Sequence, residues 1–201
     1  MTKATAQEKR ATRDQILEAT LETLRDEGFA GATSRAIARR GGFNQALVFY
    51  YFGSLDGLLL AALDLTSNRR LERYREALAA ASGLEQMVQT AAELYREDRE
   101  SGHMTVVSQL VAGSLARREL APQVLASMEP WLEFARETIE RAVAGTPLAG
   151  LVPVDEAASA VITFYLGVNL LSNLDGGGRT DALFAHLDTV APLARVLEGG
   201  T

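Results

Sequence analysis

Few side chains in this sequence have a spacing that could support catalysis. Glu100 and His103 form a Glu-x-x-His sequence, which di-iron carboxylate bundles use to bind metal. That kind of site needs the motif twice, and the other histidine, His186, has Leu183 three residues before it. The motif is therefore incomplete, and we predict no metal centre.

Other kinds of active site also lack their essential residues. Gly176–Gly178 follow a predicted helix instead of a strand, without the lysine and hydroxyl that hold nucleotide phosphates. The 201 residues include no cysteine, so a thiol nucleophile and thiolate metal ligands are excluded. Neither a nucleophile-elbow sequence nor a histidine cluster occurs. We expect a protein that is not an enzyme and uses no cofactor.

Amide and aromatic side chains gather in residues 41–52, whose sequence is GGFNQALVFYYF. An exposed glutamine can bind adenine through two hydrogen bonds, and alanine or leucine can contact a thymine methyl group. Tyrosine hydroxyls can donate to phosphate oxygens, which positions a protein on DNA without reading its sequence. The residues predicted to contact DNA, with A·T pairs favoured, are Gln45, Ala46, Leu47, Phe49, Tyr50 and Tyr51.

Large apolar side chains in the same stretch have a second use. A head of some fifty residues needs them to close its core, because a small domain buries only part of its surface. We expect Val48 and Phe52 to pack inside this core. Phe49 suits core packing and DNA contact about equally.

A helix-turn-helix would present these side chains. Thr12 and Gln15 have the spacing of a capping box, which predicts a first helix at about 13–27. Gly28 follows it, at the position where a left-handed residue commonly ends a helix. Its apolar residues recur at helical spacing, which gives the helix one face for the core.

The next two helices are shorter. Thr33 is expected to cap the second helix, which Gly41 and Gly42 stop. Asn44 is expected to cap a third helix of roughly two turns, since its side chain can accept amides two or three residues on. Three short helices with a glycine corner make a helix-turn-helix, and the pattern stays helical beyond residue 54.

Charge is divided unevenly along the chain. Residues 1–52 hold eight basic and six acidic residues, whereas the remainder holds 12 basic and 20 acidic ones. The net charge of −6 therefore splits into +2 for the first segment and −8 for the rest. This division suits a small head that faces DNA and is joined to an acidic body.

Residues 32–59, with the sequence ATSRAIARRGGFNQALVFYYFGSLDGLL, resemble the DNA-binding segment of TetR-family transcriptional repressors. The resemblance implies an all-α fold. Residues 1–52 would form a three-helix helix-turn-helix head, and residues 53–201 a helical domain for effector binding and dimerisation. It also implies that the threonine capping the second helix touches phosphate. The implied DNA-binding positions are Thr33, Asn44, Gln45, Ala46, Leu47, Phe49, Tyr50 and Tyr51, and Arg35 is added as a nearby surface cation.

Three departures from the family pattern affect DNA binding. Ala46 stands where the family usually has glycine, and Phe49 and Tyr51 stand where tyrosine and histidine are usual. Leu55 replaces a lysine that is common at the start of the fourth helix, which removes one phosphate contact.

A single reading helix recognises too few base pairs to select one site, so such heads act as symmetric pairs on palindromes. We therefore predict a homodimer on double-stranded DNA. The helices at 157–174 and 180–197 are the expected interface, because the first carries no charge and must be covered on both sides. The resemblance implies the same four-helix interface.

The helices between head and interface mix pliable, aromatic and hydrogen-bonding side chains, which suits a small-molecule pocket as well as a core. The resemblance places an inducer pocket there. Few basic residues adjoin the apolar stretches, which favours an uncharged or weakly polar effector. The candidate ligand-binding residues are His103, Gln109, Met128, Trp131, Tyr165 and Asn169.

A regulator released from a palindromic operator by its effector is one hypothesis. The alternative is an adaptor that keeps the fold and acts through protein contacts, which the weakly charged head and Leu55 favour. The polar start of the chain lacks the apolar segment of a secretion signal, and polar residues interrupt the uncharged stretch at 157–174. We expect a cytoplasmic protein without a membrane span.

Overall fold

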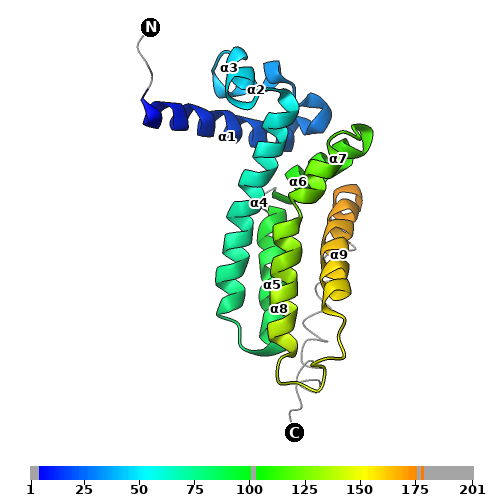
Figure 1. The fold of residues 1–201 in the computed structure, drawn as a ribbon. Coiled ribbons are helices and arrows are strands. Elements are labelled where there is room, and N and C mark those ends of the chain that lie inside the picture. The colour runs from blue at the N-terminus through cyan, green and yellow to red at the C-terminus, as the bar shows by residue number, and fades with distance from the viewer. Residues whose placement is uncertain (1–4, 101–102, 176–177, 179–201) are drawn as a thin grey trace. The chain divides into compact units, whose positions relative to one another are not determined.

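The computed structural model describes residues 5–100, 103–175 and 178, and these residues form helices and connecting turns without a strand. The predicted all-α fold is confirmed (Figure 1). Its helices are α1 (Ala6–Gly31), α2 (Ser34–Gly41), α3 (Ala46–Phe52), α4 (Leu55–Ala79), α5 (Gly83–Glu100), α6 (His103–Ala116), α7 (Ala121–Ala126), α8 (Glu129–Val143) and α9 (Val154–Asp175).

The chain divides into two compact units. The first comprises the described residues up to Asn68 together with Thr105–Ser127, and the second comprises Arg69–Met104 and the described residues from Met128 onward. Helix α4 contributes its first part to one unit and its last part to the other. The predicted boundary between DNA-binding and effector-binding regions, at residues 52 and 53, remains a prediction.

Helix α1 begins earlier than predicted. Its capping box is formed by Thr5 and Glu8, with Thr5 N donating to Glu8 Oε2 at 2.6 Å and Glu8 N donating to Thr5 Oγ1 at 3.2 Å. The predicted cap, Thr12, lies inside the helix and donates its hydroxyl to the Glu8 carbonyl. Gly28 interrupts the helix as expected, because its φ of 70° is in the left-handed region.

The corner between α2 and α3 follows the sequence closely. Thr33 caps α2 by accepting the Ala36 amide at 3.1 Å, and Gly42 ends it with φ of 68°. Helix α3 begins one residue later than predicted, so Gln45 occupies the N-cap position. Asn44 still satisfies an amide of the first turn, since its Oδ1 accepts from Ala46 N at 2.8 Å.

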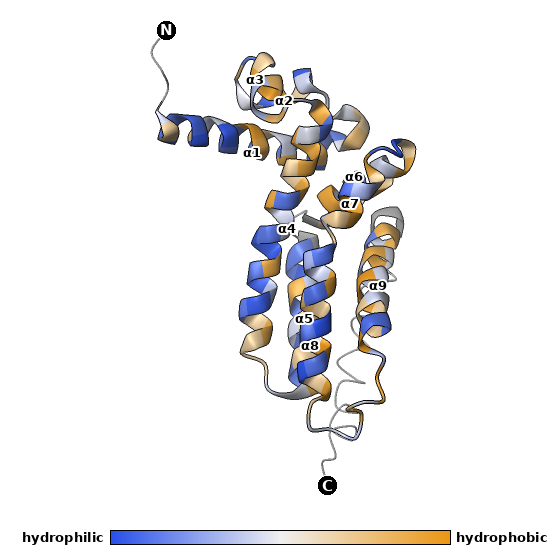
Figure 2. Ribbon diagram, viewed as in Figure 1, coloured by the Kyte–Doolittle hydropathy of each residue, from blue (hydrophilic) through white to orange (hydrophobic). Residues whose placement is uncertain are grey.

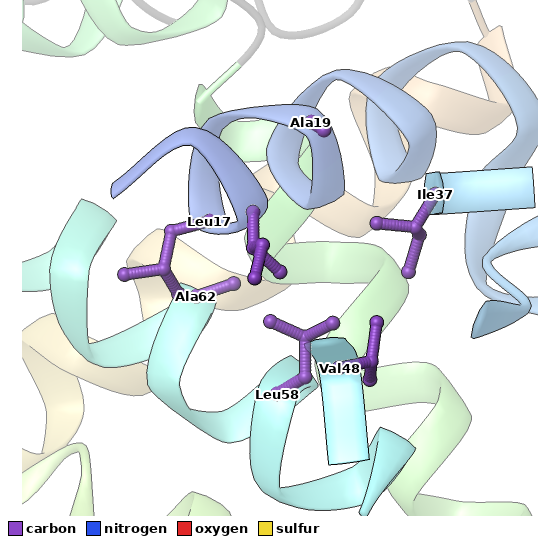
Figure 3. Packing of buried hydrophobic residues seen from close by; sticks show 7 residues of the cluster. Leu17, Ala19, Ile37, Val48, Leu58 and Ala62 are labelled. Carbon is purple, nitrogen blue, oxygen red and sulfur yellow. The ribbon is translucent and has the colours of Figure 1, made fainter. Parts of the chain in front are cut away.

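The first unit is built on a core that joins α1, α2, α3 and α4. Figure 3 shows Ile37, Val48 and Leu58 converging from α2, α3 and α4, with Leu17 of α1 beside Ala62 of α4 in the same cluster. Each is at most 1% exposed. Burial of an aliphatic side chain of this size stabilises a fold by about 1.5–3 kcal/mol. The core therefore holds α3 in place through Val48.

One side of α6 covers the end of α1. Gln109 and Gly113 are four residues apart and share a helix face, and Arg117 directly follows the end of α6. Phe29 N donates to Gln109 Oε1 at 3.1 Å, and the Arg117 guanidinium lies 5.1 Å from the Phe29 ring centre. Arg117 also pairs with Asp56 at the start of α4. These contacts attach α6 to the helix-turn-helix within the first unit.

Replacing Gly113 with alanine should lower the free energy of unfolding by about 1–3 kcal/mol, because overpacking forces neighbours to shift. An added Cβ would lie 2.4 Å from the Phe29 ring. Urea unfolding followed by circular dichroism measures the change. Leu115→Ala on the same helix is the control, since Leu115 is 78% exposed and should change stability by less than about 0.5 kcal/mol. Unchanged stability in G113A would show that Phe29 moves aside without cost.

The second unit packs the last part of α4 with α5, α8 and α9. Its core joins Leu71, Leu78, Met87, Leu94 and Phe134, and α8 packs against both α5 and α9.

Helix α9 differs from the others in this unit, because hydrophobic residues follow one another along its described length (Figure 2). Its stretch Val154–Ser172 is long and apolar enough to cross a membrane, with a hydropathy of 1.3. Helices that pack against protein meet the same criteria, so this one helix is weak support for a membrane protein.

Candidate nucleic-acid interface

Helix α3 has one buried side and one exposed side. Val48 is 0% exposed and anchors the helix, as the sequence predicts. Phe49 and Tyr50 are 49% and 68% exposed, although large aromatic side chains usually lie inside. Gln45 and Ala46 are also exposed, at the start of the helix. The exposed side therefore offers an amide and a methyl group at one end and a phenol at the other.

Leu47, Tyr51 and Phe52 take an intermediate position. All three are partly buried and pack against the core of the first unit. The Tyr51 ring lies edge-on to the Tyr50 ring, with centroids 4.9 Å apart. Arg13 covers the Phe52 ring at 5.2 Å. Phe52 is thus a packing residue as predicted, and Leu47 and Tyr51 support the exposed side of α3.

Thr33 and Asn44 use their side-chain oxygens within the fold. Both oxygens accept backbone amides, which leaves the Thr33 hydroxyl proton and the Asn44 amide protons as donors. Both residues are exposed. They can therefore cap helices and donate to an external acceptor at the same time.

Acidic side chains neutralise two of the cations beside α3. Arg40 Nη1 lies 2.5 Å from Asp26 Oδ2, and this hydrogen bond lowers the pKa of Asp26. Glu27 lies within 4 Å of both Arg39 and Arg40, at 3.8 and 3.4 Å. Arg35 is exposed on α2. The positive charge that faces solvent is smaller than the number of arginines indicates.

Gln15, which the sequence predicts to be part of a capping box, instead connects two helices of the helix-turn-helix. Gln15 Nε2 donates to the Gly41 carbonyl at 2.8 Å, which ties α1 to the end of α2. Gly41 itself lies against Phe43, where an added Cβ would come within 2.3 Å of the ring. The first of the two glycine positions therefore has no room for a larger side chain.

Residues 16–62 match the family model described as bacterial regulatory proteins, tetR family. The match to the TetR family therefore covers this segment of the chain. All predicted DNA-contacting residues fall within it. The HTH-type transcriptional regulator BetI 1 of Chromohalobacter salexigens is 47% identical over 51 residues, which is 25% of each chain. The chain thus spans about a quarter of the length of this curated relative.

Solved structures of regulators share the fold over nearly the whole chain. The fatty acid degradation regulator FadR of Bacillus halodurans superposes with a TM-score of 0.76 at 15% identity, covering 96% of both chains. A regulator from Saccharomonospora viridis, solved in complex with choline, gives 0.71 at 19% identity, covering 90% of this chain and 95% of that one. These identities show the fold alone. All three relatives are named as regulators and none as an enzyme, in agreement with the prediction.

The candidate ligand-binding residues fall in different places. Trp131 and Tyr165 stack with ring centroids 6.5 Å apart in the second unit, and Asn169 is buried one turn beyond Tyr165 on α9. Met128 is partly buried at the start of α8. Gln109 instead belongs to the first unit, where it accepts the Phe29 amide. The side chain of His103 lies outside the described residues.

The residues described by the structure include no group of three or more histidine, cysteine, aspartate or glutamate side chains that could hold a metal ion.

Proposed function

We propose that this protein is a TetR-type transcriptional repressor, which binds a palindromic operator as a homodimer in the cytoplasm and leaves it when a small-molecule effector binds. The observation that carries this proposal is the exposed side of α3. Its polar and aromatic residues face solvent while Val48 fixes the helix from behind. A rigid element with exposed hydrogen-bonding groups is what a reading helix in the major groove requires.

Base contacts and phosphate contacts are proposed to lie at different places along α3. The first exposed residues, Gln45 and Ala46, lie at the N-terminal end of α3, which a helix-turn-helix inserts toward the base edges. Tyr50 lies a turn further on, where its hydroxyl would donate to a phosphate. Thr33 and Arg35, at the start of α2, would contact the neighbouring backbone.

The proposed dimer forms through α9. Val161, Phe164, Leu170 and Leu171 are each 50–55% exposed, and apolar residues gathered on one helix mark an interaction surface. The predicted segment 157–174 lies within this helix, whereas the second predicted segment, 180–197, lies outside the described residues. A two-fold pair would place the reading helices on half-sites about 34–36 Å apart.

The effector is proposed to act by shifting a population. A ligand held by the second unit would favour a spacing of the two reading helices that no longer fits consecutive major grooves. Choline is bound in the neighbour from Saccharomonospora viridis, which supports a small organic molecule as the kind of effector.

A gel-shift titration with the DNA flanking the protein's own gene tests this function. The repressor should bind one segment selectively, with an affinity that falls steeply as salt rises. The adaptor alternative draws support from the acidic partners of Arg39 and Arg40 and from Leu55, which is partly buried in the core. Equal and feeble binding to every DNA segment would favour that alternative.

Two substitutions on α3 should weaken binding in different ways. Gln45→Ala should cost about 1–3 kcal/mol on the preferred operator and little on other DNA, since a lost bidentate contact removes discrimination. Tyr50→Phe should weaken binding to all sequences alike, by about 0.5–1.5 kcal/mol for one lost hydrogen bond. Gel-shift titrations on operator and scrambled DNA measure both. The opposite pattern would reverse the assigned roles.

A further inference from the structure

The second unit contains a buried carboxylate that the proposed DNA contact does not use. Asp98 on α5 is 0% exposed. Its Oδ2 accepts hydrogen bonds from the Tyr74 hydroxyl at 2.9 Å and the Tyr165 hydroxyl at 2.6 Å. Burial raises the pKa of both phenols, so both remain donors across the physiological range. Asp98 Oδ1 pairs with the guanidinium of Arg70 on α4.

Aromatic rings connect around this carboxylate. Tyr74 lies 5.3 Å from Trp131 and 6.5 Å from Tyr165, and Tyr165 lies 5.6 Å from Tyr95, measured between ring centroids. Trp131 and Tyr165 are stacked, at an interplanar angle of 24°. We call Tyr74, Tyr95, Trp131 and Tyr165 the aromatic cluster. Aromatic rings beside a carboxylate are the surroundings in which proteins bind organic cations.

Arg70 is an incompletely bonded partner for Asp98. Its Nη2 makes the ion pair with Asp98 Oδ1, whereas its Nε is buried and makes no hydrogen bond in the described part of the chain. A buried donor without an acceptor costs about 1–3 kcal/mol. A ligand cation that needs no hydrogen bond, such as a quaternary ammonium group, would avoid this cost.

A second polar group in the same unit has no partner. Asn169 on α9 is 1% exposed, and its Nδ2 makes no hydrogen bond to any described residue. It lies one turn from Tyr165, on the same helix. A buried amide of this kind can donate to a hydroxyl or carbonyl on a bound molecule.

We propose that Asp98 and the aromatic cluster recognise an organic cation, whose ammonium group takes the place of the Arg70 guanidinium and whose polar end binds Asn169. Its role as the effector rests on the proposed function. Arg70 lies on α4, the helix that also supplies Leu58 and Leu59 to the first unit. Breaking the ion pair between Arg70 and Asp98 would therefore alter the contacts of a helix that belongs to both units. Because this carboxylate is buried, we propose a cationic effector in place of the uncharged or weakly polar one that the sequence favours.

Trp131 is the only tryptophan in the chain, so its fluorescence reports on this site directly. The probes are choline, tetramethylammonium and benzyltrimethylammonium, and 3,3-dimethyl-1-butanol is the uncharged counterpart of choline. We expect the cations to change Trp131 emission in a saturable way. The alcohol should bind about tenfold or more weakly, because it lacks the charge. Equal binding of choline and the alcohol, or no response to any cation, would overturn the proposal.

Three variants sharpen the test. Asp98→Asn should weaken choline binding about tenfold or more, while Glu93→Gln, which changes an exposed carboxylate on the same helix, should leave it unchanged. Arg70→Met should tighten choline binding, because it removes the competing cation. Weaker choline binding by Arg70→Met would contradict displacement of the Arg70 guanidinium by the ligand. This variant also keeps the test decisive if Asp98→Asn fails to fold.

Gel shifts with and without choline separate this inference from the proposed function. Cation binding that leaves operator affinity unchanged would refute the effector role alone. Operator binding without any cation response would refute the site and leave the repressor standing. A protein that binds cations and no operator would refute the repressor.

Discussion

Replacing Phe164 with glutamate should convert the dimer to monomers and weaken operator binding about a thousandfold. Phe164 is 51% exposed on α9, in the middle of the proposed interface. A dimer would bury the new carboxylate of each subunit without a cation, which is far more costly than the loss of one apolar contact. A monomer retains one reading helix, so it keeps little more than the affinity of non-specific binding.

Leu125→Glu provides the matched control. Leu125 is a 63% exposed apolar residue on α7, outside α9, so the same change of charge there should leave the dimer intact. Analytical ultracentrifugation measures the subunit state, and gel shifts measure operator affinity. A Phe164→Glu protein that remains dimeric would place the interface elsewhere.

Replacing Asp98 with alanine should lower the free energy of unfolding by about 3–5 kcal/mol, because it removes the buried anion of Arg70 and leaves that guanidinium only Glu97, at 3.9 Å. Two phenolic donors, Tyr74 and Tyr165, would also lose their acceptor. The double variant Arg70→Met with Asp98→Leu should recover the part of this loss that comes from the ion pair, since well-packed apolar residues replace buried ion pairs at little cost, but the two phenols still lack an acceptor. Urea unfolding followed by circular dichroism gives the values.

The control for Asp98 is its neighbour. Glu97 pairs with Arg73 at 3.3 Å and with Arg70 at 3.9 Å, and its side chain is 47% exposed. Exposed pairs contribute at most about 1 kcal/mol, so Glu97→Ala should have a small effect. Comparable losses in both variants would show that Asp98 contributes no more than a surface charge.

Much of the helix-turn-helix could be predicted because its signals are local. Thr33, Gly42 and Gly28 act within a few residues of themselves, through a capping oxygen or a left-handed backbone. The predicted start of α1 was wrong because the sequence contains two capping-box patterns. The pattern that begins at Thr12 matches as well as the one at Thr5, which forms the cap in the structure. A helix can continue through the second box once the first has begun it.

Contacts between distant residues could not be read in this way. Gln15 and Gln109 make their hydrogen bonds to carbonyl and amide groups 26 and 80 residues away, and polar side chains give no local sign of such partners. The burial of Asp98, by contrast, could be predicted from the sequence. Asp98 follows Leu94 and Tyr95 at spacings of four and three residues, so the helical period assigns it to the buried face of α5. The candidate ligand residues Trp131, Tyr165 and Asn169 lie in the same unit as Asp98.

The attachment of α6 and α7 to α1 affects the order in which the chain can fold during synthesis. Leu24, Leu59 and Leu63 share their core with Leu110 and Val124. A nascent chain that has reached residue 68 therefore exposes these leucines to water until the later helices leave the ribosome, roughly 3 to 11 s afterwards at usual rates of translation. The amino-terminal unit becomes complete only when two-thirds of the protein has been made.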